Sequence, residues 1–167
     1  VREGFPGLYL LADNTTPASP HARWFDRHYN SSAFLQRECL HGPLDRVRSH
    51  LARRWRRHGL GPVNYDYLKM IEPLDRDHPR QLPILLTGWD TTPRHKERGV
   101  VSRNFGVEGM RRHLARIGQR LARQDGPPML IIKSWNEWAE GNLLEPDDQF
   151  GFQLLEPYRD WVAQQRR

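Results

Sequence analysis

The sequence has few of the residues that build disulfide frameworks, metal clusters and membrane spans. Its one cysteine, Cys39, excludes an internal disulfide and a cysteine-based metal cluster. No apolar run approaches the roughly 20 residues that cross a bilayer, so we expect no membrane span. Residues 1–30 lack the charged, apolar and small-residue zones of a signal peptide. A lone thiol suits a reducing compartment, and we therefore expect a cytoplasmic protein.

Lysine is also scarce, since only three of the 26 basic residues are lysines. The net charge of +6 and the pI of about 10.0 invite a nucleic-acid interpretation. However, the densest arginine cluster, residues 46–57, alternates with apolar positions three and four residues apart. This spacing predicts an amphipathic helix over residues 43–58, with most arginines on its solvated face. We therefore expect no nucleic-acid partner, while attraction to anionic glycans or lipid headgroups stays open.

Short apolar runs alternate with amphipathic segments along the chain. A length of 167 residues with 37% hydrophobic content predicts one folded domain. Apolar strands that alternate with amphipathic helices predict parallel pairing in an α/β fold. Polar motifs follow the strands, at the edge where barrels and open sheets bind ligands. The predicted strands are residues 8–12, 63–67, 82–86 and 129–132, and the predicted helices are residues 43–58, 107–121 and 150–164.

The most informative motif follows the last predicted strand and holds two carboxylates between tryptophans. Glu137 and Glu140 lie three residues apart, beside Trp135 and Trp138. A continued strand would point the two acids to opposite faces, whereas a helical turn would make them neighbours. Paired carboxylates suit glycoside cleavage, and tryptophans pack on sugar rings or shield the acids from water. An alternative of equal weight is that the motif begins a surface helix, with the acids at the positive end of the helix dipole and the tryptophans in the core.

A second polar motif, residues 88–94, follows the preceding predicted strand. One hypothesis is that Asp90 hydrogen-bonds sugar hydroxyls and Trp89 stacks on a sugar ring. The other is that Asp90 and Arg94 pair with each other and hold the loop. Tyr65, at the end of the second predicted strand, either lines the same cleft or packs in the core.

The two motifs together resemble a known family. Ser-Trp-Asn-Glu-Trp-Ala-Glu-Gly-Asn-Leu-Leu-Glu-Pro-Asp, residues 134–147, closely resembles the C-terminal signature of WbsX-type proteins. These are grouped with glycoside hydrolase family 99 and are often described as glycosyltransferases of lipopolysaccharide O-antigen synthesis in bacteria. Residues 88–94 resemble a second signature, with Thr91 where Asn is more usual. Two motifs in the right order, about 45 residues apart, make the resemblance specific.

The resemblance implies a (β/α)8 barrel that acts on glycans without a metal ion or cofactor. In family 99 hydrolases, which are endo-acting α-mannosidases, the paired glutamates of this motif are catalytic. Carried over, Glu140 would be the acid/base and Glu137 would engage the 2-hydroxyl of the substrate. Glu145 belongs to the signature, with a structural or a ligand-facing role open. The motif positions expected to contact substrate are Trp135, Asn136, Trp138 and Glu145.

The chain is shorter than the family fold. The resemblance covers residues 62–165 well and residues 1–60 only loosely. A (β/α)8 barrel typically needs about 250 residues, and this chain supplies about four strands. We therefore expect residues 1–167 to form one partial domain, the C-terminal half of a barrel or a truncated barrel. Open sheet edges and an exposed apolar face would then pair with a second copy or with a missing N-terminal half.

These observations favour a glycan-active enzyme domain that cleaves or remodels α-linked sugars of bacterial surface polysaccharide. One alternative is a glycosyltransferase that uses an activated donor. Its metal-binding Asp-x-Asp motif is matched only by residues 75–77, in a proline-flanked loop. The alternative from another class is an inactive truncated barrel that only binds glycan.

Overall fold

A computed structural model describes residues 7–15, 18–32, 43–75, 78, 80–124 and 126–165. Cys39 and the last two residues of the Asp-x-Asp triplet lie outside this part of the chain, so the expectations about them stay untested. Among the described residues, no helix combines the length and the apolar character that crossing a bilayer requires.

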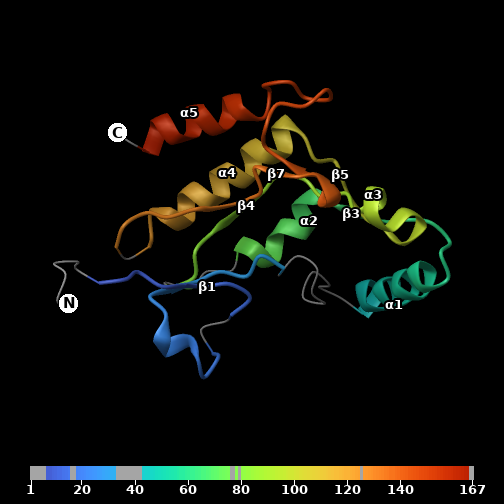
Figure 1. The fold of residues 1–167 in the computed structure, drawn as a ribbon, viewed down its shortest axis with the longest axis horizontal. Coiled ribbons are helices and arrows are strands. Elements are labelled where there is room, and N and C mark those ends of the chain that lie inside the picture. Colours follow the sequence, from blue (N-terminus) through green and yellow to red (C-terminus); the bar gives the residue numbers. More distant parts are fainter. Residues whose placement is uncertain are drawn as a thin grey trace.

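The elements follow one another as short strands and mostly longer helices (Figure 1). The strands are β1 (Leu11–Ala12), β2 (Arg27–His28), β3 (Val63–Asp66), β4 (Ile84–Leu86), β5 (Val100–Arg103), β6 (Ile131–Lys133), β7 (Asn136–Glu137) and β8 (Asn142–Leu143). The α-helices are α1 (Pro43–Arg57), α2 (Tyr67–Ile71), α3 (Thr92–His95), α4 (Val107–Leu121) and α5 (Leu155–Gln165). Short 3-10 turns are η1 (Ala22–Trp24), η4 (Glu72–Asp75), η5 (Lys96–Arg98) and η6 (Trp138–Glu140).

Three strand pairs are parallel, as predicted: β1 with β2, β3 with β5, and β4 with β6. A parallel bridge between His28 and Gln81 joins β2 to the segment that enters β4. An antiparallel bridge between Asp90 and Val101 joins the segment leaving β4 to β5. The parallel pairs therefore form one connected system around β4, and the barrel itself stays a prediction.

Several elements differ from the sequence-based expectation. No strand is predicted between residues 87 and 128, yet β5 forms over Val100–Arg103 and pairs with all four residues of β3. The predicted strand 63–67 ends at Asp66, whose carboxylate Oδ1 accepts hydrogen bonds from the amides of Leu68 and Lys69 and so starts α2. Helix α5 begins at Leu155, five residues later than predicted.

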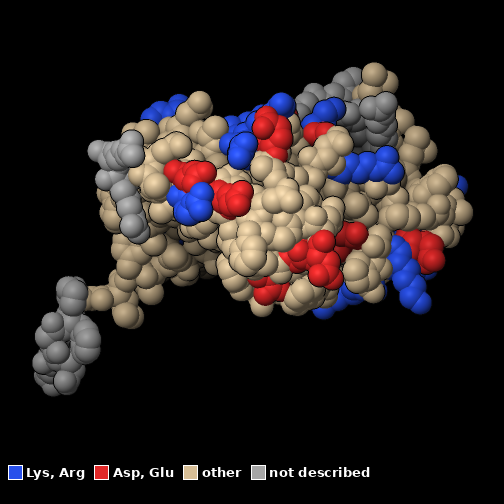
Figure 2. Space-filling model, turned by 90° about the horizontal axis from the view of Figure 1, so that it is seen from above, with Lys and Arg blue, Asp and Glu red and all other residues tan. Residues whose placement is uncertain are grey.

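Acidic and basic side chains are interspersed on the face shown in Figure 2. The basic residues there are separated by acidic and uncharged ones. Such a surface differs from the continuous basic stripe that a nucleic-acid interface needs. This face therefore gives no support to a nucleic-acid partner.

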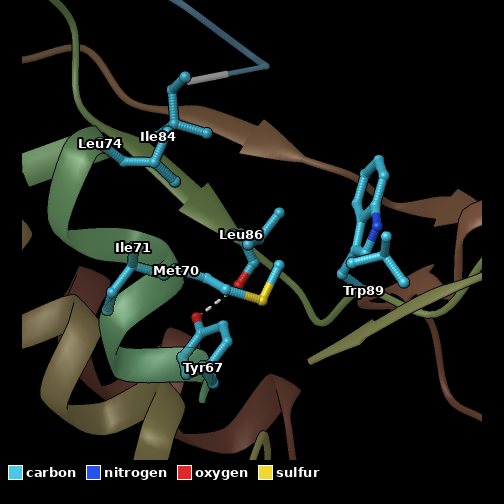
Figure 3. Packing of buried hydrophobic residues seen from close by; sticks show 8 residues of the cluster. Tyr67, Met70, Ile71, Leu74, Ile84, Leu86 and Trp89 are labelled. Atoms are coloured by element: carbon cyan, nitrogen blue, oxygen red, sulfur yellow. Dashed lines mark hydrogen bonds between the residues drawn. The ribbon is translucent and has the colours of Figure 1, made fainter. Parts of the chain in front are cut away.

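Strand β4 is buried on both faces. Ile84 and Leu86 pack with α2 residues such as Tyr67 and Met70 in one core cluster (Figure 3). Leu85 points to the other side and packs with α4 residues such as Leu114. Alternate residues of a strand face opposite sides, so a strand covered twice needs a continuous apolar run. This explains why residues 82–86 carry no polar position.

A buried polar group ties the two core clusters together. The hydroxyl of Tyr67 donates to the carbonyl of Leu86 at 2.6 Å and lies 2.9 Å from Nδ1 of His113, on α4. The hydroxyl has one hydrogen, so it accepts from His113 Nδ1–H, and this assigns the neutral tautomer. Burial, with smaller contributions from Arg116 and Arg120, lowers the pKa of His113 from 6.5 to about 3. His113 is therefore uncharged in the folded protein at neutral pH.

We expect the folded state to lose stability as the pH falls below about 6.5. The unfolded chain takes up a proton on His113 from that pH downward, whereas the folded protein does so only near pH 3. The contribution is fully present above pH 6.5 and decreases by about 1.4 kcal/mol per pH unit, or about 2 kcal/mol by pH 5. Urea unfolding at pH 7 and pH 5 measures it.

The matched comparison is His113→Phe against His58→Gln, since His58 is exposed. His113→Phe should be less stable at pH 7 but should lose less stability than the wild type on acidification. His58→Gln should keep the wild-type difference. An unchanged pH dependence in His113→Phe would contradict this account.

Candidate functional site

The two polar motifs meet at the carboxyl ends of β4 and β6. The amide of Thr87 donates to the carbonyl of Lys133 at 2.8 Å, which continues the β4–β6 pairing. The Thr87 hydroxyl lies 2.9 Å from the Ser134 carbonyl, to which it can donate, and accepts from the Ser134 amide at 3.0 Å. Thr87 is buried, so these contacts fix where both motifs leave the sheet. The sequence-based prediction that the motifs share one edge agrees with this arrangement.

The glutamate motif folds into a small antiparallel hairpin. Strand β7 pairs with β8, and η6 closes the hairpin between them. The Ser134 hydroxyl accepts from the amide of Glu137 at 3.1 Å and donates to the carbonyl of Asn142 at 3.0 Å. A helical turn does follow Asn136, as a 3-10 turn with Glu137 just before it and Glu140 at its end. The two acids are thus held at opposite ends of one short turn.

The hairpin is locked against the loop that carries Asp90. The amide of Asp90 donates to the carbonyl of Glu140 at 2.7 Å. Gly141 has a φ of +60°, and a Cβ there would lie 2.9 Å from both Cβ and N of Asp90. The buried side chain of Asn142 donates to the carbonyl of Gly88. Glycine at position 141 therefore serves both a left-handed backbone and a close approach of two loops.

Glu140 is the more protected of the two acids. Its Oε2 lies 3.2 Å from Nζ of Lys133, and the two side chains are 26% and 22% exposed. The same ammonium group stands 5.4 Å from the ring centre of Trp89, a cation–π contact. Trp89 is only 5% exposed and belongs to the core cluster of β4 and α2. Most of the Trp89 ring is thus used for packing, and its predicted stacking on a sugar stays a prediction.

The other motif residues point outward. Asn136 and Glu137 are exposed, as are Trp135 and Trp138. The tryptophans are therefore not core residues, which disfavours that part of the alternative interpretation. The backbone carbonyl of Trp135 accepts from the amides of Leu144 and Glu145, at 2.9 Å and 3.0 Å, so the loop beneath the exposed rings is well fixed.

A cleft of about 450 Å³ opens beside the hairpin. Trp138 and Gly141 line it from the hairpin, and Trp89 and Asp90 line it from the loop after β4. Its aromatic wall also includes Phe105 and Phe150, whose rings meet edge to face at 5.9 Å. Neither glutamate lines the cleft itself. Glu137 directly precedes Trp138 in the chain and Glu140 directly precedes Gly141, and both of those neighbours line the cleft.

Asp90 has a local partner. Its Oδ1 accepts from the amide of Thr92 at 2.8 Å and from the Thr92 hydroxyl at 2.6 Å, at the start of α3. Arg94 is exposed on α3, and no ion pair joins it to Asp90 among the contacts of the described residues. Asp90 therefore fixes the loop by its hydrogen bonds with Thr92, and it also lines the cleft.

Tyr65 and Glu145 lie at the margins of the site. Tyr65 is half-buried and packs against the β4–α2 core cluster, and it pairs with Ser102 across β3 and β5. Ser102 accepts a hydrogen bond from the amide of Trp89 at 2.9 Å and lines the cleft. Glu145 is half-buried, with Oε1 shielded from solvent. Tyr65 therefore packs against the core beside a cleft-lining residue and does not line the cleft itself.

Sequence reasoning missed three kinds of contributor. Lys133 is the last residue of β6 and directly precedes the glutamate motif. The sequence feature that could have identified it is a single lysine at the end of an apolar run. Thr87 links the two motifs, but a single threonine after a strand carries no distinctive pattern. Phe105 and Phe150 come from segments far apart in the sequence and meet only in the fold. Within the described residues, no group of three or more His, Cys, Asp or Glu side chains could hold a metal ion.

Comparison with known proteins gives two kinds of match. Two uncharacterized WxcX proteins of Xanthomonas campestris pv. campestris, from strains B100 and ATCC 33913, are each 40% identical over 79 residues. The match covers 46% of this chain and 11% of each relative, so the chain spans a small part of their length. No solved structure matches the chain. The model of the family described as glycosyltransferase WbsX matches residues 1–157, and because this is most of the sequence, the chain belongs to the WbsX glycosyltransferase family.

Proposed function

We propose that this chain carries the glutamate-bearing part of a glycan-active site that cleaves or remodels α-linked sugars of bacterial surface polysaccharide. Membership of the WbsX family supports a glycan substrate and a place in polysaccharide synthesis. The observation that carries the proposal is the hairpin beside the cleft. There, one glutamate held by a lysine and one exposed glutamate flank an exposed tryptophan.

The two acids differ in a way that suits two roles. Glu140 is partly buried and fixed through Lys133, whereas Glu137 is exposed at the start of the turn. Glycoside cleavage needs one group at the leaving oxygen and another at the ring side. We assign Glu140 to the proton transfer and Glu137 to the 2-hydroxyl of the sugar, following the family 99 resemblance.

The aromatic side chains supply a surface for sugar rings. Trp138 is 63% exposed and also lines the cleft, so its free face can pack on the C–H face of a sugar. Trp135, two residues before Glu137 in the chain, is 51% exposed. The cleft beyond Trp138, with its aromatic wall and the polar atoms of Asp90 and Ser102, would hold the neighbouring sugar.

Glycosyl transfer is the second candidate, favoured by the description of the family as a glycosyltransferase. The same two acids could serve it, with a sugar hydroxyl in place of water as the acceptor. The parallel pairs around β4 also support the proposal that the chain is part of a (β/α)8 barrel, whose active site lies at the carboxyl ends of its strands.

Replacing Glu140 should abolish turnover. Glu140→Gln keeps the size of the side chain but removes its proton transfer, so kcat should fall by about a hundredfold or more. Release of sugar from α-linked mannan oligosaccharides measures hydrolysis, and labelled product formed from an added acceptor glycan measures transfer. Glu137→Gln should have a comparable effect.

The control is Glu108→Gln, an exposed glutamate on α4 paired with Arg112, which should leave activity unchanged. Full activity in Glu140→Gln would refute the acid/base assignment. Glycan binding without turnover in the wild type, unchanged in the Glu137→Gln/Glu140→Gln variant, would identify a binding module instead.

Lys133 should act as a positioning residue. Lys133→Met removes the partner of Glu140, so kcat should fall by up to about a hundredfold while KM changes little, because orientation rather than binding is lost. Lys133→Arg keeps a cation there and should recover part of kcat. Lys69→Met, at an exposed position of α2, is the matched control.

Steady-state kinetics on the same oligosaccharides separates kcat from KM for each variant. A structural role alone would lower the unfolding temperature and leave kcat of the remaining folded protein intact. That outcome, or equal losses in the Met and Arg variants, would contradict the positioning role.

A further inference from the structure

Helix α1 exposes the side that its sequence pattern marks as apolar. Its apolar positions recur three and four residues apart, which places them along one stripe of the helix. All four are between 49% and 78% exposed, and Trp55 closes the stripe at the last turn. Figure 1 shows α1 at the edge of the molecule, away from α4 and α5. The members of this apolar stripe are Leu44, Val47, Leu51 and Trp55.

The contacts of α1 with the body leave much of the stripe exposed. Helix α1 touches β3 and η5. Arg56 donates through Nε to the carbonyl of Arg98 at 2.9 Å, which ties the last turn to η5. At 100° per residue, Arg56 stands roughly 100° to 180° away from the stripe positions around the helix. The helix is therefore attached by a side other than its apolar one.

Positive charge accompanies the stripe. The helix has six arginines and one aspartate, so it carries one of the strongest local charges of the chain. A hollow of about 420 Å³ on the helix is lined by His50, Arg54, Arg57 and His58. Arg54 follows Val47 and Leu51 by seven and three residues, so this basic hollow borders the C-terminal part of the apolar stripe.

We propose that α1 is an interfacial helix that binds the surface of an anionic bilayer. The apolar stripe enters the boundary between headgroups and acyl chains, and the basic hollow receives the anionic lipid headgroups beside it. Many charged residues, few apolar ones beyond a single stripe, and a tryptophan at the end of that stripe are the features of helices that lie in this boundary. This inference is independent of the chemistry proposed for the glutamates.

The charge of α1 favours an anionic bilayer over the other partners that could cover its apolar stripe. A second copy of the chain would bring another helix of the same strong positive charge against this one, and like charges oppose such an association. A nucleic acid would satisfy the arginines but would leave the exposed leucines and Trp55 unused. An anionic bilayer satisfies both at once, since each basic residue near the surface adds attraction and the apolar side chains leave water.

Vesicle binding of the full chain tests the proposal. The chain should sediment with vesicles of equal parts phosphatidylcholine and phosphatidylglycerol, and not with phosphatidylcholine alone. Raising the salt concentration should weaken binding, because the attraction to headgroups is screened. Trp55 fluorescence, taken as the difference from Trp55→Phe, should shift to the blue on binding and be quenched by brominated acyl chains.

Two variants separate the two parts of the surface. Arg54→Gln/Arg57→Gln should weaken binding by about thirtyfold, at roughly fivefold for each basic residue removed. Val47→Ser/Leu51→Ser should weaken it by at least about tenfold through lost apolar burial. Arg111→Gln/Arg112→Gln removes the same charge from exposed positions of α4 and should bind as the wild type does.

Three outcomes of these experiments would contradict binding of α1 to an anionic bilayer. Equal binding of all variants, or no binding to the anionic vesicles by a chain whose circular dichroism is that of a folded protein, would overturn the proposal. So would a dimer that the Val47→Ser/Leu51→Ser variant converts to a monomer, which would show a second copy on the stripe. Because the substituted positions are exposed, we expect every variant to fold, and circular dichroism of each one checks this.

Discussion

The double burial of β4 is the constraint on which the rest of the structure depends. Ile84 and Leu86 pack against α2 on one face of the strand, and Leu85 packs against α4 on the other. With both faces covered, the edges of β4 remain for pairing, and β6 takes one of them in parallel register. The two chain segments that leave this pair must then emerge side by side at the same end. The meeting of the glutamate motif and the Asp90 loop follows from the core.

Sequence reasoning succeeded where local pattern and tertiary packing agree. Helix α4 has the predicted bounds because its apolar residues keep helical spacing through four turns and meet a packed core. It failed for β5, where two valines in a polar stretch carry little pattern and pairing with β3 decides the conformation. The acids and tryptophans of residues 134–147 could be singled out in the sequence because their types are chemically distinctive. Tertiary contacts bring Lys133 and Phe105 to the site, and no short sequence motif predicts those contacts.

The candidate site combines rigid and accessible parts. Its base is fixed by backbone hydrogen bonds from Thr87, Ser134 and Asp90, which leave the outgoing chain few alternatives. Above this base, Trp135, Asn136, Glu137 and Trp138 are open to solvent. Preorganised groups on a fixed frame are what catalysis of a polar reaction requires, while open aromatic faces admit an extended polymer. The site therefore joins a fixed base to an open aromatic surface, and the glycan proposed above would lie on that surface.

Because Gly141 contacts Asp90, the glutamate hairpin and the loop that carries Asp90 cannot change their backbone shape independently. A Cβ at position 141 would need space that the Asp90 backbone fills, and the Asp90 amide is bound to the carbonyl just before this glycine. Lengthening or reshaping one loop would displace the other and move Glu140 with it. Any redesign of this region would have to alter both loops together, and the glutamate motif grafted alone onto another protein would lack its counterpart.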